Sequence, residues 1–269
     1  MTILDTIKAK KLEEVTALKS RISIAELEQF PLFQSATRSL KKAITSSVTG
    51  GIVAEFKRKS PAKGNINLDA NVVEVTQGYT EALVSGLSVL SDENFFGAKP
   101  TDFELARQNN AIPILRKDFI VDEYQLFQSK AMGADVILLI AKILTKKQLQ
   151  SYTNLAHELG LEVFLETQNE AEILENMDLN FDLIGINNRN LNSFEVSVEN
   201  SIRLAQLLPK SSVKIAESGI QSLETIQLLK ANGFDGFLIG EYFMKEEQPA
   251  VKCYELIQKL KGWRLKFAE

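Results

Sequence analysis

Short apolar runs alternate with longer amphipathic stretches from Gly50 onward. Short runs rich in Ile, Val, Leu and Phe are typical of buried strands, whereas apolar residues spaced three and four apart predict helices. We expect strands at Ile52–Phe56, Leu87–Leu90, Ile112–Arg116, Val136–Ile140, Glu162–Leu165, Leu183–Ile186, Lys214–Ala216 and Gly236–Ile239. Helices are expected at Asp69–Ser85, Thr101–Asn109, Asp122–Met132, Thr145–Leu159, Asn169–Met177, Val198–Leu208, Ser222–Ala231 and Pro249–Leu260.

The strict alternation of strand and helix predicts an α/β protein with a parallel sheet. Eight units of similar length favour a (β/α)8 TIM barrel, which typically needs about 250 residues. An open doubly wound sheet is the alternative, and as a dinucleotide-binding fold it would favour a Gly-x-Gly-x-x-Gly turn after the first strand. The segment Glu55–Gly64 has no such turn, so we favour the barrel.

The residues before the first strand carry no strand pattern and are expected to be helical. Apolar residues recur there at roughly helical spacing, at Ile3, Ile7, Leu12, Val15 and Leu18. A second short helix is expected at Ser35–Ile44. We therefore predict a single domain, with residues 1–46 as an N-terminal helical extension packed on a barrel of residues 47–269. This extension is expected to cover part of the barrel mouth.

Several predicted strands end on a charged or amide side chain. Such a group is costly at the end of an apolar strand unless that end opens onto water or a ligand. In a parallel barrel, the carboxyl ends of the strands converge on one such site. The residues concerned are Glu55, Lys57, Lys117, Glu166, Asn187 and Glu217. Any one of them could serve in a structural ion pair, but together they predict acid–base chemistry by lysine and glutamate at one mouth.

The last two strands run into Ser218-Gly219 and Gly240-Glu241. The loops after strands seven and eight of such barrels often bind phosphate through backbone N–H groups, and glycine lets the backbone approach an anion closely. Either glycine alone is equally compatible with a tight turn, whereas the pair favours phosphate. Arg189 is a plausible charged partner, although it could instead form a surface ion pair.

Composition narrows the chemistry further. The net charge of −4 argues against general nucleic-acid binding. The N-terminus has no apolar signal-peptide core, and no apolar run is long enough to cross a membrane. The single cysteine, Cys253, fits a reducing cytoplasm, and we expect it to be buried in the last helix. With one histidine, His157, a zinc cluster is not expected.

Several segments, taken in order, closely resemble the indole-3-glycerol phosphate synthase family. They are Ala54–Gly64, Ser88–Asp92 with Phe95–Gly97, Leu115–Phe119, Ile184–Leu191, Ala216–Ile220 and Leu238–Gly240. The likeness covers essentially the whole chain. It implies a (β/α)8 barrel with an N-terminal helical extension that acts in the penultimate stage of tryptophan biosynthesis.

The reaction implied is ring closure, decarboxylation and dehydration of 1-(2-carboxyphenylamino)-1-deoxyribulose 5-phosphate. The resemblance implies neither a metal nor an organic cofactor. Lys117 looks like the general acid, and Glu166 resembles the base of the dehydration step. Lys57 resembles the partner of the substrate carboxylate and is a second candidate for the acid. Glu55, Asn187 and Glu217 would orient these groups and hold the ribulose hydroxyls.

The resemblance also implies two binding regions. The phosphate site would comprise Ser60, Arg189, Ser218, Gly219, Gly240 and the N–H of Glu241. An apolar slot for the anthranilate ring would comprise Phe96, Phe119 and Leu138. The sequence departs from the commonest family pattern at Ala62 and Glu241, where many members have Ser, and at Ser91, where Thr is frequent. These departures leave every proposed acid or base in place and put only the phosphate affinity in doubt.

Two other functions remain as alternatives. A phosphoribosylanthranilate isomerase would be expected to place a Cys and an Asp at strand ends, but the single cysteine lies in the last predicted helix. A non-catalytic regulatory barrel would keep the phosphate end and lose Lys57, Lys117 or Glu166. We therefore expect a monofunctional cytoplasmic enzyme, monomeric and acting on a small sugar phosphate with an anthranilate ring. Partners of nucleic acid or membrane are not expected.

Overall fold

A closed barrel of parallel strands forms the centre of the molecule. The computed structural model describes residues 2–190 and 195–265. In this part of the chain, neighbouring barrel strands pair in the order β1-β10-β9-β8-β7-β6-β5-β4, and β4 closes the ring on β1. The barrel strands are β1 (Ile52–Phe56), β4 (Gly86–Leu90), β5 (Ile114–Lys117), β6 (Val136–Ile140), β7 (Glu162–Thr167), β8 (Leu183–Asn187), β9 (Lys214–Glu217) and β10 (Gly236–Ile239). This arrangement confirms the predicted (β/α)8 barrel.

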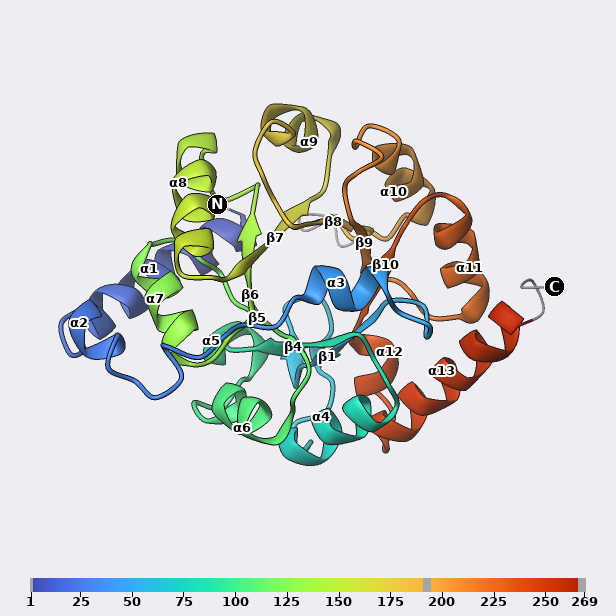
Figure 1. The fold of residues 1–269 in the computed structure, drawn as a ribbon, viewed down its shortest axis with the longest axis horizontal. Coiled ribbons are helices and arrows are strands. Elements are labelled where there is room, and N and C mark those ends of the chain that lie inside the picture. Colours follow the sequence, from blue (N-terminus) through green and yellow to red (C-terminus); the bar gives the residue numbers. More distant parts are fainter. Residues whose placement is uncertain (1, 191–194, 266–269) are drawn as a thin grey trace.

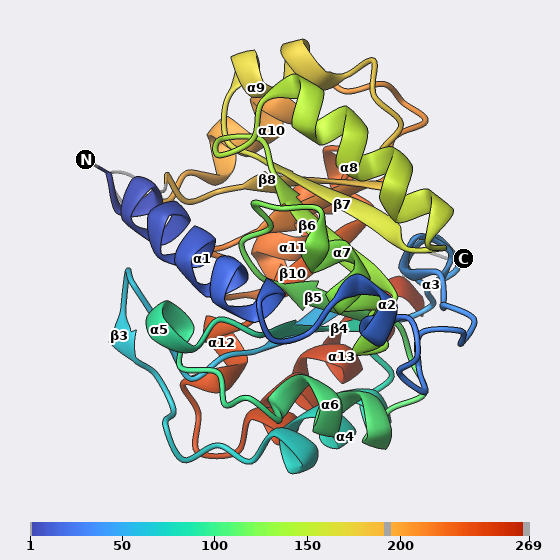
Figure 2. The same ribbon diagram turned by 90° about the vertical axis from the view of Figure 1, so that its left-hand side faces the viewer.

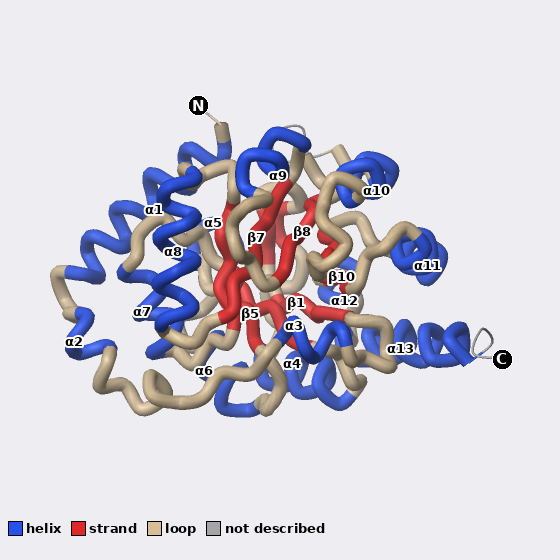
Figure 3. The backbone as a smooth tube through the Cα atoms, turned by 45° about the horizontal axis from the view of Figure 1, so that its top comes forward, coloured by secondary structure: helices blue, strands red, loops and turns tan. Residues whose placement is uncertain are grey.

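Helices surround the strands on the outside of the barrel (Figures 1 and 3). They are α4 (Val72–Glu81), α6 (Asp102–Asn109), α7 (Tyr124–Ala131), α8 (Lys146–Glu158), α9 (Glu170–Asn176), α10 (Val198–Ala205), α11 (Leu223–Ala231) and α13 (Pro249–Leu265). Each overlaps a predicted helix, and most are shorter at their ends. The predicted helix Asp69–Ser85 begins only at Val72 because Asn71 caps it, accepting hydrogen bonds from the N–H groups of Val73 and Glu74.

The register brings the polar strand ends to one rim. Ile140 pairs with Glu166, and Asn187 pairs with Glu217 on the adjacent strands. On the same rim, short elements that the sequence pattern did not predict follow three strands. They are the two-stranded pair β2 (Lys59–Ser60) and β3 (Gly64–Asn65), α5 (Glu93–Phe96) and α12 (Glu241–Met244). Two-residue strands and one-turn helices are too short to carry a periodic signal.

Helix α1 (Ile3–Lys19) lies at the mouth end of the barrel, on the same side as α5 and β3 (Figure 2). A capping box formed by Thr2 and Asp5 starts the helix. Its buried residues are Leu4, Ile7, Lys11 and Val15. The helix expected from the spacing of Ile3, Ile7, Leu12, Val15 and Leu18 is present, but Leu12 is 43% exposed. The inward position is taken by Lys11, whose charge is compensated by partners from outside the helix.

Helix α3 (Leu40–Thr45) covers the opposite opening. Leu40 and Ile44 are buried in the barrel core, and Glu162 accepts hydrogen bonds from the N–H groups of Leu40 and Lys41. The predicted helix Ser35–Ile44 was wrong at its start, because Ser39 caps the helix and residues 35–39 are irregular. A further one-turn helix, α2 (Ile24–Leu27), packs with α1 against α7.

The single cysteine and the single histidine both lie in helices on the outside of the barrel. Cys253 is fully buried in α13, as predicted, and burial raises the pKa of its thiol. His157 Nε2 lies 2.9 Å from Asp182 Oδ2 on the outer side of the barrel. Within the described ranges, none of the helices is both long and apolar enough to cross a membrane.

Candidate functional site

A cavity of about 150 Å³ opens at the carboxyl ends of the barrel strands. Every residue proposed above for the site lines this cavity. These residues are Glu55, Lys57, Ser60, Phe96, Lys117, Phe119, Leu138, Glu166, Asn187, Arg189, Glu217, Ser218, Gly219, Gly240 and Glu241. Their convergence on one cavity follows from the parallel register, which places all strand ends on one rim. Their individual roles stay predictions.

Lys117 is the centre of the charged cluster. β5 ends on Lys117, and its Nζ lies 2.8 Å from Oε2 of Glu166 and 2.8 Å from Oε2 of Glu217. Asn187 Nδ2 donates a 2.9 Å hydrogen bond to the other oxygen of Glu166. The Lys117 side chain is 13% exposed, whereas those of Glu166 and Glu217 are 5% and 2% exposed. A buried ammonium is thus held between two carboxylates and still reaches the cavity.

Burial and charge act against each other on these groups. Burial alone would lower the pKa of Lys117, but the nearby glutamates outweigh it and hold this pKa above its ordinary value. Burial raises the pKa of Glu217 to about 7, because Lys117 offsets it only in part and Glu166 repels a second negative charge. For Glu166, Lys117 and the hydrogen bond from Asn187 outweigh burial and lower the pKa. Lys117 therefore remains a proton donor and Glu166 a proton acceptor near neutral pH.

A second lysine reaches the cavity from the end of β1, which β4 alone separates from β5 in the barrel. Lys57, just after β1, places its Nζ 2.5 Å from Oε1 of Glu55. The Glu55 carboxylate also accepts a 3.4 Å hydrogen bond from Ser88. Gly240 leaves room for this carboxylate, since a Cβ at that position would lie 2.5 Å from Glu55 Oε1. The cavity thus has two ammonium groups, each with a glutamate partner.

The loops after β9 and β10 form the other end of the cavity. Ser218 and Gly219 both have left-handed backbones, with φ values of 65° and 67°. Asn188 Nδ2 holds this turn by donating a 2.6 Å hydrogen bond to the Ser218 carbonyl. A non-glycine residue in this conformation stores strain of the kind that clusters at ligand sites. These two consecutive left-handed residues line the cavity.

Glu241 meets this end of the cavity with its carboxylate, contrary to the simplest picture of an anion site. One oxygen lies 3.3 Å from Nη2 of Arg189, and the other lies 3.2 Å from Nζ of Lys63. The resemblance assigned only the N–H of Glu241 to the phosphate site and gave its carboxylate no contact there. Instead, the carboxylate contacts the arginine proposed to bind phosphate.

Apolar side chains form a slot next to the lysines. The rings of Phe96 and Phe119 tilt against each other at 5.9 Å between centroids, and Leu138 lines the same cavity. Helix α1 adds Ile3, Leu4 and Ile7 to this lining. The sequence predicted that the extension would cover part of the mouth, but the helical spacing of Ile3 and Ile7 did not identify which of its side chains would line the cavity. The structure thus adds these residues to the candidate site.

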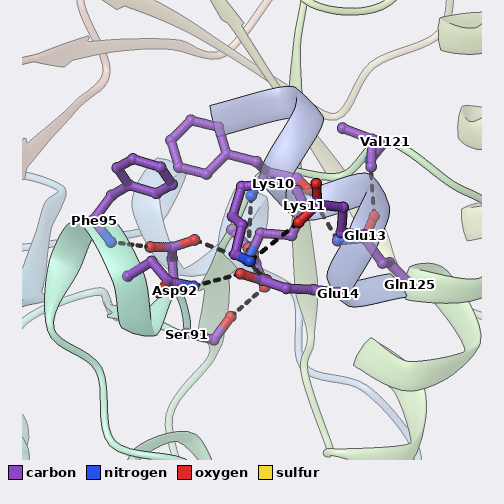
Figure 4. A network of polar contacts seen from close by, with 12 residues as sticks. Lys10, Lys11, Glu13, Glu14, Ser91, Asp92, Phe95, Val121 and Gln125 are labelled. Atoms are coloured by element: carbon purple, nitrogen blue, oxygen red, sulfur yellow. Dashed lines mark hydrogen bonds and ion pairs between the residues drawn. The ribbon is translucent and has the colours of Figure 1, made fainter. Parts of the chain in front are cut away.

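A buried ion-pair network fastens α1 to the slot (Figure 4). Nζ of Lys11 lies 2.8 Å from Asp92 Oδ2, 3.1 Å from Asp118 Oδ1 and 2.8 Å from Glu14 Oε2. Asp92 follows β4 and caps α5 by accepting a 2.7 Å hydrogen bond from the Phe95 N–H. Asp118 follows Lys117 directly. Burial lowers the pKa of Lys11, but Asp118 and Asp92 outweigh it, so this pKa is raised and the side chain stays charged.

Sequence analysis missed this network because its parts are far apart in the chain. Lys11 reads as a solvent-exposed lysine among the other charged residues of a helix, yet it is 5% exposed. The buried aspartates belong to segments that resemble the family, which was the one available signal. Within residues 2–190 and 195–265, no group of three or more His, Cys, Asp or Glu side chains is arranged to hold a metal ion.

Comparisons with known proteins agree with the geometry. A family model described as "Indole-3-glycerol phosphate synthase" matches residues 4–256. A protein of that name from Bacteroides thetaiotaomicron is 49% identical over 247 residues, covering 92% of this chain and 94% of the relative. Relatives of the same name are 40% identical in Legionella pneumophila, covering 91% of this chain and 95% of the relative, and 36% identical in Paracidovorax citrulli, covering 94% and 98%. The chain therefore belongs to the indole-3-glycerol phosphate synthase family.

Proposed function

We propose that this chain converts 1-(2-carboxyphenylamino)-1-deoxyribulose 5-phosphate to indole-3-glycerol phosphate in tryptophan biosynthesis. One observation carries the proposal: Lys117 lies between two buried carboxylates in a cavity that has an aromatic slot at one side and a glycine-rich turn at another. A sugar phosphate that bears an aromatic ring would match these regions. Family membership supports the same activity.

Ring closure requires a proton on the ketone oxygen as the aromatic carbon attacks. We infer that Lys117 donates it, since its raised pKa keeps the side chain protonated near neutral pH and its ammonium faces the cavity. General acid catalysis of this kind commonly contributes about 10²–10⁴ in rate. Loss of carbon dioxide then restores the aromatic ring. Lys57 would bind the substrate carboxylate until that step, and Glu55 would orient Lys57.

Dehydration requires a base and a donor to the leaving hydroxyl. We infer that Glu166 is the base, because its lowered pKa keeps it ionised near neutral pH. Asn187 would hold it in place through the 2.9 Å hydrogen bond. Lys57, released when carbon dioxide leaves, would protonate the leaving hydroxyl and recover its proton from solvent. Glu166 would pass the proton that it removed to the neutral amine of Lys117 across their 2.8 Å contact, which restores the ammonium. Glu217 would hold Lys117 and a ribulose hydroxyl.

The phosphate group would lie at the turn after β9 and the start of α12. Arg189 would supply the charge, and Ser60, Ser218, Gly219, Gly240 and the N–H of Glu241 would supply hydrogen-bond donors or room. The Phe96, Phe119 and Leu138 slot would take the anthranilate ring. We further infer a single domain, in which residues 1–46 pack on the barrel of residues 47–269. We expect this domain to act as a monomer in the cytoplasm, on a small molecule rather than a nucleic acid or a membrane.

Replacing Glu241 with Ser is expected to lower KM for the phosphate substrate about five- to tenfold with little change in kcat. The Glu241 carboxylate lies 3.3 Å from the Arg189 guanidinium and competes with phosphate for this cation. Its negative charge would also repel a phosphate dianion. A unit charge about 4 Å away corresponds to about 1 kcal/mol when it is screened as fully as in water, which sets the lower end of the expected effect. The measurement is steady-state kinetics of Glu241→Ser, beside inhibition by inorganic phosphate. Glu247→Ser removes the same charge from an exposed position and is the control. A raised KM in Glu241→Ser would instead give its carboxylate a binding role.

The function itself is tested by adding the substrate to the wild-type chain. Indole fluorescence should appear, and one molecule of carbon dioxide should be released for each molecule of indole product. A folded protein that binds inorganic phosphate but releases neither product would favour the non-catalytic regulatory barrel.

A further inference from the structure

A second cavity, of about 300 Å³, lies at the opposite end of the barrel from the candidate active site. Its walls come from the linker between α2 and α3, from α6, and from the stretch that leads from α7 into β6. The linker runs to α3 on the side away from α5 and β3 (Figure 2). Asp135, in the cavity wall, precedes β6 and so lies at the amino end of that strand. None of the residues proposed for catalysis lines this cavity.

Three cationic side chains face this cavity with one carboxylate between them. The cations are Arg38, Arg107 and Lys130, and the carboxylate is Asp135. Arg107 is 7% exposed and Lys130 is 8% exposed, while Arg38 lies nearer the surface, with its side chain 44% exposed. Two buried cations and one half-exposed cation thus share a single negative charge. The whole chain has a net charge of −4, so the excess of positive charge is a local feature of this cavity.

Asp135 already uses its acceptor capacity inside the protein. One oxygen accepts from Nη1 of Arg107 at 2.7 Å and from the N–H of Ile114 at 2.8 Å. The other accepts a 2.7 Å hydrogen bond from the N–H of Arg38, whose Nη1 stands 3.7 Å away. Asp135 is therefore committed mainly to Arg107 and to the backbone, and it compensates the other two cations only weakly.

Lys130 is the least compensated of the three. Its Nζ donates a 2.9 Å hydrogen bond to the carbonyl oxygen of Ser35, which carries no full charge. Among the described residues, no carboxylate oxygen lies within ion-pair distance of this ammonium, and burial lowers its pKa. Burying a cation is costly unless an anion or a set of hydrogen bonds compensates it. This cavity therefore has the charge, the donors and the room for an anion.

We propose that this cavity binds a phosphate dianion, either free or as a small phosphate monoester, between Arg38 and Lys130. Three cations and one carboxylate leave two positive charges, which match a dianion. The planar arginine fork suits phosphate oxygens, and a lysine adds a point charge. Because Arg38 belongs to the linker and Lys130 to α7, the bound anion ties the N-terminal extension to the barrel.

The test uses the full chain and two probes, inorganic phosphate and glycerol 3-phosphate. Calorimetric titration of the wild type should require two sites, one at the mouth and one at this cavity. The double variant Arg38→Gln with Lys130→Gln should retain only one, since each lost charge-assisted hydrogen bond weakens binding about tenfold or more. Lys146→Gln with Arg203→Gln removes the same charge from exposed pairs elsewhere and should retain both sites.

Hydrogen exchange localises the second site. Phosphate should slow exchange in residues 32–38 of the wild type and of the control, but not in the double variant. Binding of both probes at this cavity or of inorganic phosphate alone supports the proposal. It is overturned if neither probe slows exchange in residues 32–38, or if the double variant binds like the wild type. Should the double variant fail to fold, Arg38→Gln alone decides the question, because this side chain is half exposed and its loss should still weaken the second site about tenfold.

Discussion

Replacing Lys117 with Met is expected to lower kcat about 10²–10⁴-fold while the protein stays folded. Lys117 ends a barrel strand, and its Nζ lies 2.8 Å from each of two buried carboxylates. Within the described residues, no other lysine at a barrel strand end has this arrangement. Met keeps most of the side-chain volume but carries no proton to donate. Removing the ammonium also leaves Glu166 and Glu217 to repel each other, so Glu166 loses the charge that lowers its pKa. Single-turnover measurement of indole fluorescence would isolate the chemical steps.

Two companion variants make this result interpretable. Lys146→Met changes an exposed lysine on α8 and should leave kcat unaltered. Lys57→Met should raise KM more than it lowers kcat if Lys57 mainly binds the substrate carboxylate. Retained turnover in Lys117→Met, combined with a large loss in Lys57→Met, would transfer the acid role to Lys57. Inhibition by inorganic phosphate reports whether the phosphate end remains intact in each variant.

Lys11→Met is expected to lower the free energy of unfolding by about 3 kcal/mol, the scale for removing one partner of a buried ion pair. The change leaves Asp92 and Asp118 without their shared ammonium in a site where both are at most 3% exposed. Arg116, which lies 2.8 Å from Asp118, compensates one of them and limits the loss. The measurement is denaturant unfolding followed by circular dichroism.

The same variant should also affect catalysis in a way that simple destabilisation would not. Asp92 caps the helix that carries Phe96, and Asp118 lies between Lys117 and Phe119. KM should therefore rise several-fold more than kcat falls under conditions where the variant is fully folded. Lys10→Met is the matched control, because its exposed pair with Glu13 is one residue away on the same helix and should contribute less than about 1 kcal/mol. Equal unfolding curves for the two variants would show that the buried network does not stabilise α1.

Both variants bear on the role of the N-terminal extension, which the sequence predicted to be helical and to cover part of the barrel mouth without indicating what holds it there. Ile3 and Ile7 recur at helical spacing, but spacing alone does not say what a helical face covers. The burial of Lys11 rather than Leu12 was unpredictable from periodicity. The cost of burying its charge is offset by two aspartates more than 80 residues further along the chain. Only the folded barrel brings those groups together.

The candidate site was predictable to a different extent at its two ends. Glu55, Lys117, Glu166, Asn187 and Glu217 could be identified because a polar residue at the end of an apolar strand is unusual and because parallel strands share one rim. The sequence identified Glu241 as part of the site, but it did not predict where the Glu241 carboxylate points. That direction depends on Arg189 and on Lys63, which reaches the site from the loop after β1.

The sequence by itself determined the class of fold, the number of barrel strands and the end at which the polar residues gather. Strand and helix periodicities are local properties, and the parallel connection then restricts the topology. Tertiary structure alone decided which charges meet. Lys117 between Glu166 and Glu217, Lys11 between Asp92 and Asp118, and Lys130 without a carboxylate all depend on contacts between distant segments. The physical reason is that the free energy of a buried charge is set by the partners that surround it in space, whatever their separation in the chain.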